Sequence, residues 1–208
     1  MKASFFQRLG AYIIDTLIIG IIASMICYSL PSNDSTIEKQ ISSLSEKYVA
    51  GEVTMHDFYG EYNKLLYQQQ KDTMLETGIT LILTIGYFVV FQYMNKGQTL
   101  GKRLLNIRVV DNDGKRPTII KGLIRSLIVL GIASTIIDLI LLNTIPQKTY
   151  IPCYLIISVI ETIFIVITAI CVLYRKDRRG LHDMMANTNV IREGRWLHAW
   201  IYWSRINS

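Results

Sequence analysis

Charged side chains are scarce in this sequence, and the first long apolar stretch has almost none. Only 18% of the residues are charged, whereas half are hydrophobic. From Leu9 to Leu30 the one charged side chain is that of Asp15. At a rise of about 1.5 Å per residue, this stretch is long enough to cross the ~30 Å hydrocarbon core of a bilayer. The scarcity of charge therefore argues against a soluble domain and favours an integral membrane protein.

Cysteine is also rare, and its positions show no metal-binding spacing. The three cysteines lie in or at the ends of apolar segments: Cys27, Cys153 and Cys171. We interpret them as small hydrophobic residues, not as metal ligands or a disulfide framework. His182-Asp183 is an isolated doublet, and the helical metalloprotease motif is missing. We therefore expect no metal site, no cofactor and no enzymatic activity.

Four apolar stretches are long enough for transmembrane helices, at about residues 9–30, 77–93, 119–142 and 151–174. An even number of spans places both termini on the same side of the membrane. Fifteen of the 22 lysines and arginines lie before the first span, between the second and third, or after the fourth; the opposite side holds five. Because basic loops stay in the cytoplasm, we predict a multi-pass cell-membrane protein with both termini cytoplasmic. The net charge of +6 then reflects topology, and we expect no nucleic-acid partner.

The segment 31–73 is too long for a simple connection between spans. Apolar residues recur at helical intervals from Ile37 to Tyr48 and again from Met55 to Tyr62. We predict an extracytoplasmic helical hairpin, which would serve either as a lid on the membrane helices or as a docking surface for a protein partner.

Two shorter features complete the predicted all-α membrane fold. The β-branched runs at residues 106–110 and 188–191 suggest a small cytoplasmic β element. The C-terminal segment 193–208 carries three tryptophans at spacings of four and three: Trp196, Trp200 and Trp203. Such an aromatic face is typical of an amphipathic helix in the membrane interface. We thus expect a transmembrane domain over residues 1–192, including the 31–73 insert, and an interfacial tail.

Three motifs, in order along the chain, resemble those of the RDD family of bacterial and archaeal membrane proteins. They are residues 6–15 (FQRLGAYIID), 97–110 (GQTLGKRLLNIRVV) and 179–183 (RGLHD). By motif position, the resemblance places the family's arginine at Arg8 and its two aspartates at Asp15 and Asp183. The sequence departs from the family after His182-Asp183, where MMANT replaces a pattern closer to LLAGT. The resemblance implies transport of a solute or exchange of cations for protons as candidate activities.

Charged residues inside a membrane normally face a partner or a water-filled path. Besides Asp15, the predicted spans contain three candidates: Arg125, Asp138 and Glu161. Asp15 and Arg125 each lie six residues, roughly 9 Å, inside the cytoplasmic end of their spans. We therefore expect these two to pair, and Arg8, nearer the surface, to contact Asp183. The pairs would serve either to lock helices together or to carry a proton-linked or cation-linked carboxylate.

Glu161 is the stronger transport candidate. It lies about 15 Å from the start of its span by helical rise, without an obvious basic neighbour at that depth. It is either a proton-exchanging group or a neutral structural acid. Asp138 lies about one turn from the outer end and could reach interfacial water. Lys121 and Arg125, four residues apart, could bind anionic lipid headgroups.

Two functions of different classes remain open. The first is transport of a small solute, or cation/proton exchange, through Glu161 and Asp15. Since four helices enclose only a narrow path, this function would favour a homo-oligomer. The second is a non-transporting membrane protein that binds, protects or regulates another protein through residues 31–73.

Overall fold

The computed structural model describes residues 1–193 except 29 and 31–33. The predicted interfacial anchors Trp196, Trp200 and Trp203 lie outside the described residues. The described chain is mostly helical, with a single two-stranded sheet among the described residues.

Among the described residues, three helical runs are long and apolar enough to cross a membrane: α1 (Phe5–Cys27), Met74–Met94 and α9 (Gln147–Tyr174). The second run comprises α4 (Met74–Ile85), the π-helical turn η1 (Gly86–Phe91) and α5 (Gln92–Met94). A bent pair, α7 (Ile119–Val129) and α8 (Ile132–Thr144), forms a fourth candidate span. The described part of the chain is therefore mostly helical, with three or four candidate membrane-spanning segments.

The prediction of one continuous third helix over 119–142 is wrong. The chain bends by 68° between α7 and α8. Gly131, at the bend, has a φ of 62°, a left-handed conformation that only glycine adopts readily and that a right-handed helix cannot include. A glycine within an apolar run is a weak sequence signal, because many membrane helices contain one without bending.

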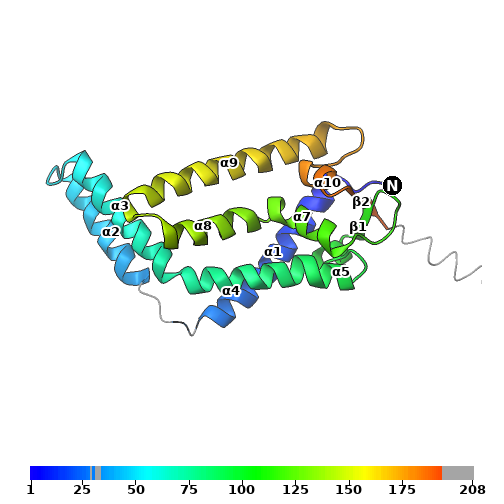
Figure 1. Ribbon diagram of the computed structural model, residues 1–208, viewed down its shortest axis with the longest axis horizontal. Helices are drawn as coiled ribbons and strands as arrows, with labels where there is room; N and C mark the ends of the chain where they lie inside the picture. Colours follow the sequence, from blue (N-terminus) through cyan, green and yellow to red (C-terminus); the bar gives the residue numbers. More distant parts are fainter. Residues whose placement is uncertain (29, 31–33, 194–208) are drawn as a thin grey trace, which may run out of the picture.

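A polar helical hairpin lies at one end of the bundle. It consists of α2 (Asp34–Val49) and α3 (Met55–Asp72), joined by a turn in which Gly51 has a φ of 76°. The hairpin contacts the membrane helices through Tyr67, whose hydroxyl donates to the Leu142 carbonyl over 3.3 Å. Only Thr73 separates α3 from α4, so the hairpin runs almost directly into the second span (Figure 1).

The sheet lies at the opposite end (Figure 1). There α6 (Leu100–Leu104) precedes β1 (Ile107–Asp111), and α10 (Leu181–Met185) precedes β2 (Thr188–Arg192). The strands pair antiparallel, with Val109 opposite Val190. They are the two β-branched runs proposed as partners from the sequence. Their inner face packs on the start of α1 in a small buried cluster: Ala3, Ala11, Ile107, Val109 and Val190.

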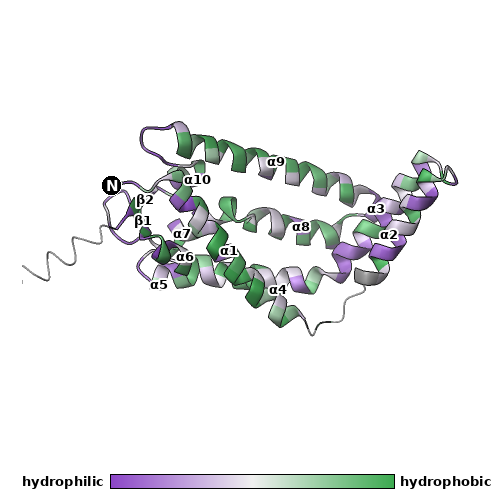
Figure 2. Cartoon of the chain, turned by 180° about the vertical axis from the view of Figure 1, so that it is seen from behind, coloured by the Kyte–Doolittle hydropathy of each residue, from purple (hydrophilic) through white to green (hydrophobic). Residues whose placement is uncertain are grey.

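Apolar side chains cover the middle of the molecule. Figure 2 shows α9 and most of α1 and α8 as hydrophobic, whereas α2, α3 and the loops at the sheet end carry most of the hydrophilic residues. Many large hydrophobic residues of α9 are exposed, among them Ile156 and Val159 at 61% and 56%. An exposed apolar band between polar ends matches the surface of a protein embedded in a bilayer.

Candidate functional site

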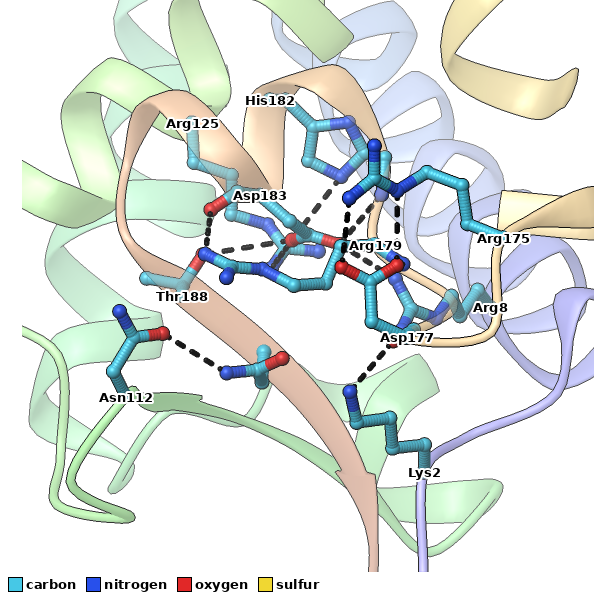
Figure 3. A network of polar contacts seen from close by, with 12 residues as sticks. Lys2, Arg8, Asn112, Arg125, Arg175, Asp177, Arg179, His182, Asp183 and Thr188 are labelled. Carbon is cyan, nitrogen blue, oxygen red and sulfur yellow. Dashed lines mark hydrogen bonds and ion pairs between the residues drawn. The ribbon is translucent and has the colours of Figure 1, made fainter. Parts of the chain in front are cut away.

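Asp183 is the centre of a buried ion cluster at the sheet end. It follows Gly180 by three residues, in the short helix α10, and is completely buried. Its Oδ2 lies 2.6 Å from Nη1 of Arg8, and its Oδ1 lies 2.6 Å from Nη1 of Arg125 (Figure 3). One carboxylate thus joins α1, α7 and α10. The Arg8–Asp183 contact is the one expected from the sequence.

The expected pairing of Asp15 with Arg125 is wrong. Arg125 contacts Asp183 instead, and Asp15 accepts hydrogen bonds from uncharged donors. Both residues lie at similar distances along their helices, but depth alone does not determine the direction in which a side chain points. That direction depends on how each helix is rotated about its axis by packing.

Further contacts hold Asp183 in the charged form. The amide of Gly180 donates to Oδ2 over 3.3 Å, and Nε2 of His182 lies 3.3 Å from Oδ1. Burial alone would raise the pKa of Asp183, but the positive charge of Arg125, the hydrogen bond from His182 and the positive charge of Arg8 hold that pKa well below its usual range. Burial lowers the pKa of His182, so its imidazole is neutral at pH 7.

Asp15 forms a second buried site, between α1 and α6. Its Oδ1 accepts hydrogen bonds from the Tyr87 hydroxyl over 2.6 Å and from the Gly101 amide over 2.7 Å. Its Oδ2 accepts from the Thr99 hydroxyl. A Cβ on Gly101 would lie 2.4 Å from the carbonyl oxygen of Ala11, so only glycine permits this approach. The family-like motif at 97–110 therefore supplies two of the three donors to Asp15.

Lys102 lies next to this site. Its ammonium donates to the side-chain oxygen of Gln92 and lies 5.8 Å from the centre of the Phe88 ring. Burial and, to a smaller extent, the positive charge of Arg125 lower the pKa of Lys102 to about 7, although Asp15 and Asp183 act in the opposite direction. This lysine therefore changes charge near neutral pH.

A cavity of about 250 Å³ lies between α1, α7 and α9, beside both sites. Arg8, Lys102, Arg125 and Asp15 line it together with mostly apolar side chains. Four buried side-chain atoms in its lining residues have no hydrogen-bond partner among the described residues: Arg8 Nε, Arg8 Nη2, Thr168 Oγ1 and His182 Nδ1. Buried polar atoms are nearly always paired, with protein or with ordered water, so these four atoms are the candidates for contact with a polar ligand or water in this cavity.

The other predicted charged residues, Asp138 and Glu161, are not among the residues that line this cavity. Asp138 accepts a 2.7 Å hydrogen bond from the Tyr150 hydroxyl. Glu161 lies at the α7–α8 bend, where a Cβ on Gly131 would be 2.3 Å from its Oε1. A carboxylate there is favoured by the positive end of the α8 dipole. Its role in proton exchange stays a prediction.

Lys121 and Arg125 point to different partners. Lys121 lies 3.8 Å from a carboxylate oxygen of Asp111, whereas Arg125 is directed inward to Asp183. A headgroup site on their shared face stays a prediction. In the described part of the chain, no group of three or more histidine, cysteine, aspartate or glutamate residues could hold a metal ion.

Sequence reasoning did not single out Lys102, Tyr87, Thr99 or Thr168. Lys102 and Thr99 lie within the 97–110 motif, so the motif could have suggested that its polar residues are partners of the charged residues. Tyr87 and Thr168 are single polar groups in apolar helices. A lone threonine there commonly bonds to its own helix backbone, and a lone tyrosine gives no indication of its partner. Only the packed structure distinguishes them.

Comparison with known proteins identifies the family of this chain. Searches of curated proteins and of solved structures gave no significant match. The family model for the RDD family matches residues 2–187, a range that contains the Asp15 site, the Asp183 cluster and every lining residue of the cavity except Val190. With nearly the whole chain matched, this multi-pass membrane protein belongs to the RDD family.

Proposed function

We propose that this protein binds a small solute in the cavity between α1, α7 and α9, and that this binding serves transport across the membrane. One observation carries the proposal: unpartnered buried polar atoms from three separate elements gather around one cavity inside the membrane-spanning bundle. A purely structural cluster would be expected to satisfy those atoms.

The charges around the cavity favour an anionic or neutral solute over a metal cation. Three basic residues line it, Arg8, Lys102 and Arg125, against the single carboxylate of Asp15. Both oxygens of Asp15 already accept hydrogen bonds, from the hydroxyls of Tyr87 and Thr99 and from the Gly101 amide. Cation/proton exchange is therefore the less favoured form of transport at this site.

We also propose which side of the membrane each end of the molecule faces. The sheet, α6 and α10 lie at the end of the molecule that carries the excess of basic residues, and basic segments remain in the cytoplasm. We place both termini and the sheet in the cytoplasm, and the α2–α3 hairpin outside the cell membrane. In a background without native cysteines, a membrane-impermeant maleimide should label Ser43→Cys in intact cells and Asp113→Cys only after lysis. The reverse pattern would overturn this orientation.

Flux measurements in proteoliposomes test transport. The probes are sodium, protons, inorganic phosphate and a fluorescent phosphatidylglycerol whose movement between leaflets is read by dithionite quenching. Ile165 lines the cavity, whereas Ile163, on the same helix and similarly exposed, does not. Flux of any probe that is lost in Ile165→Trp and kept in Ile163→Trp supports the proposal. Absence of flux of all four probes, or equal flux in the two variants, overturns it.

A second function has an observation in its favour. The tip of the α2–α3 hairpin exposes large apolar side chains, including Val49 at 86% and Met55 at 56%. Such a surface suits a protein partner that the hairpin binds or regulates. A photo-crosslinker at Val49 should then give one adduct of defined mass in cells, and Tyr59→Lys should remove it. An adduct that survives Tyr59→Lys, or none at all, would remove this alternative.

A further inference from the structure

We propose that the cavity binds the head group of an anionic amphiphile, an oxyanion attached to hydroxyl-bearing and apolar portions, which enters sideways from the bilayer. The inference rests on the proposed function for its choice of site and adds the class of ligand. Charge, hydrogen bonding and shape each contribute one argument.

Arg8 supplies positive charge beside the cavity. One nitrogen of its guanidinium, Nη1, pairs with Asp183. Its Nε and Nη2 are buried and have no partner among residues 1–193 that the structure describes. Two adjacent N–H groups of one guanidinium match two oxygens of a phosphate or carboxylate. Lys102 and Arg125, which line the same cavity, add to the positive potential.

His182 and Thr168 supply hydrogen-bonding atoms that are unpaired among the described residues. With Nε2 of His182 directed at the Asp183 carboxylate, a neutral ring carries its hydrogen there and leaves Nδ1 as an acceptor. Nδ1 and the Thr168 hydroxyl are both buried and unpaired within the described chain. The Nδ1 acceptor calls for a donor on the ligand, and the Thr168 hydroxyl can bind either an acceptor or a donor. A head group with a hydroxyl as well as an oxyanion, such as a glycerol phosphate, supplies both.

The shape of the cavity determines where the apolar chain of a ligand would lie. Leu9 and Tyr12 of α1 and Ile165 of α9 all line the cavity and are all at least 40% exposed. The cavity therefore opens between two membrane-spanning helices, toward lipid. At about 250 Å³ it is smaller than the ~300–1,000 Å³ of typical small-molecule sites. It suits a head group whose apolar chains remain in the bilayer.

Lipid retention, measured by native mass spectrometry, tests the proposal. The purified full-length protein is incubated in detergent with phosphatidylglycerol or with phosphatidylcholine of the same chain length. We expect at least about tenfold preference for phosphatidylglycerol, and no displacement by 10 mM inorganic phosphate. Equal retention of the two lipids overturns the proposal. Displacement by phosphate also overturns it and identifies a free anion as the ligand.

Matched variants on α9 locate the binding. Thr168→Val removes the unpaired hydroxyl and should weaken retention about three- to tenfold, the range for one hydrogen bond. Thr162→Val is the control, because its hydroxyl bonds to the Ser158 carbonyl and does not line the cavity. Ile165→Trp should abolish retention and Ile163→Trp should not. Equal effects of variant and control would place the lipid elsewhere and overturn the proposal.

This experiment and the flux assay fail independently. Selective retention of phosphatidylglycerol without flux of any probe would keep the amphiphile site and remove transport. Phosphate flux through the cavity without lipid preference would keep transport and remove the amphiphile.

Discussion

Arg125 and Asp183 lie 58 residues apart in the chain, yet their Nη1 and Oδ1 atoms meet at 2.6 Å. The same carboxylate binds Arg8 through its other oxygen. Two guanidinium groups from different membrane helices therefore depend on a single buried anion. Because one buried charge holds three elements together, the cluster fixes the wall of the cavity as well as the fold at this end.

Asp183→Asn should be strongly destabilising. It removes the negative charge that pairs with two buried arginines, and breaking a buried ion pair from one side costs about 3–5 kcal/mol. We expect a lower melting temperature in detergent, read by intrinsic fluorescence. Asp177→Asn is the control, since this residue pairs with Arg175 at the surface. A shift no larger than that of Asp177→Asn would contradict the structural role of Asp183.

Gly101→Ala should loosen α6 from α1. The added methyl would lie 2.4 Å from the Ala11 carbonyl oxygen and 2.9 Å from the Asp15 carboxylate, so the two elements must separate. Overpacking of this kind costs about 1–3 kcal/mol, and the Gly101–Asp15 hydrogen bond is lost in addition. Gly20→Ala, on α1 with nothing near its Cβ, should be close to neutral. Equal melting temperatures for the two variants would count against the close approach.

Gly131→Ala should strain the bend between α7 and α8. The left-handed backbone costs an ordinary residue about 1–2 kcal/mol, and the methyl would also lie 2.3 Å from Oε1 of Glu161. Adding Glu161→Ala should recover the part of the lost stability that is due to the clash, whereas the part due to backbone strain should remain. A double variant no more stable than Gly131→Ala would show that Glu161 does not crowd this position. Thermal unfolding of the two variants and wild type measures both terms.

Retention of phosphatidylglycerol should weaken as pH rises from 6 to 8. The pKa of Lys102 is lowered to about 7 by burial and by Arg125, so the free protein loses this charge over that interval. A bound anion favours the protonated lysine and raises its pKa, and binding therefore takes up a proton at higher pH. Linkage limits the change in affinity to about tenfold for a single group.

The groups facing Lys102 bear on this pH profile. Gln92 and Phe88 contact it, and the charges acting on it belong to Arg125, Asp15 and Asp183. Asp183 stays ionised over this range because its pKa is held far below normal. The Lys102→Met variant should retain phosphatidylglycerol more weakly, and its retention should not change between pH 6 and 8. Lys121→Met, outside the cavity lining, should show the same pH dependence as wild type. A flat wild-type profile would rule out Lys102 as the titrating group.

Local pattern predicted much of this protein. Hydropathy located the membrane-spanning segments to within a few residues, because burial in lipid demands an unbroken apolar run whatever its neighbours are. The motifs at 6–15, 97–110 and 179–183 indicated the RDD family, and their residues do meet at one end of the bundle. The Arg8–Asp183 contact followed from both residues lying near the same boundary.

Only the tertiary structure determined which side chains pair with the buried charged residues and where the cavity lies. Position along a sequence gives the depth of Asp15 and Arg125 but not their rotation about the helix axes, so the sequence paired them wrongly. Gly131 permits a bend without requiring one, so the bend is visible only in the tertiary structure. The unpaired atoms of Arg8, His182 and Thr168 come from segments far apart in the chain. Their gathering around one cavity depends on how the helices pack against one another, which no single stretch of sequence encodes.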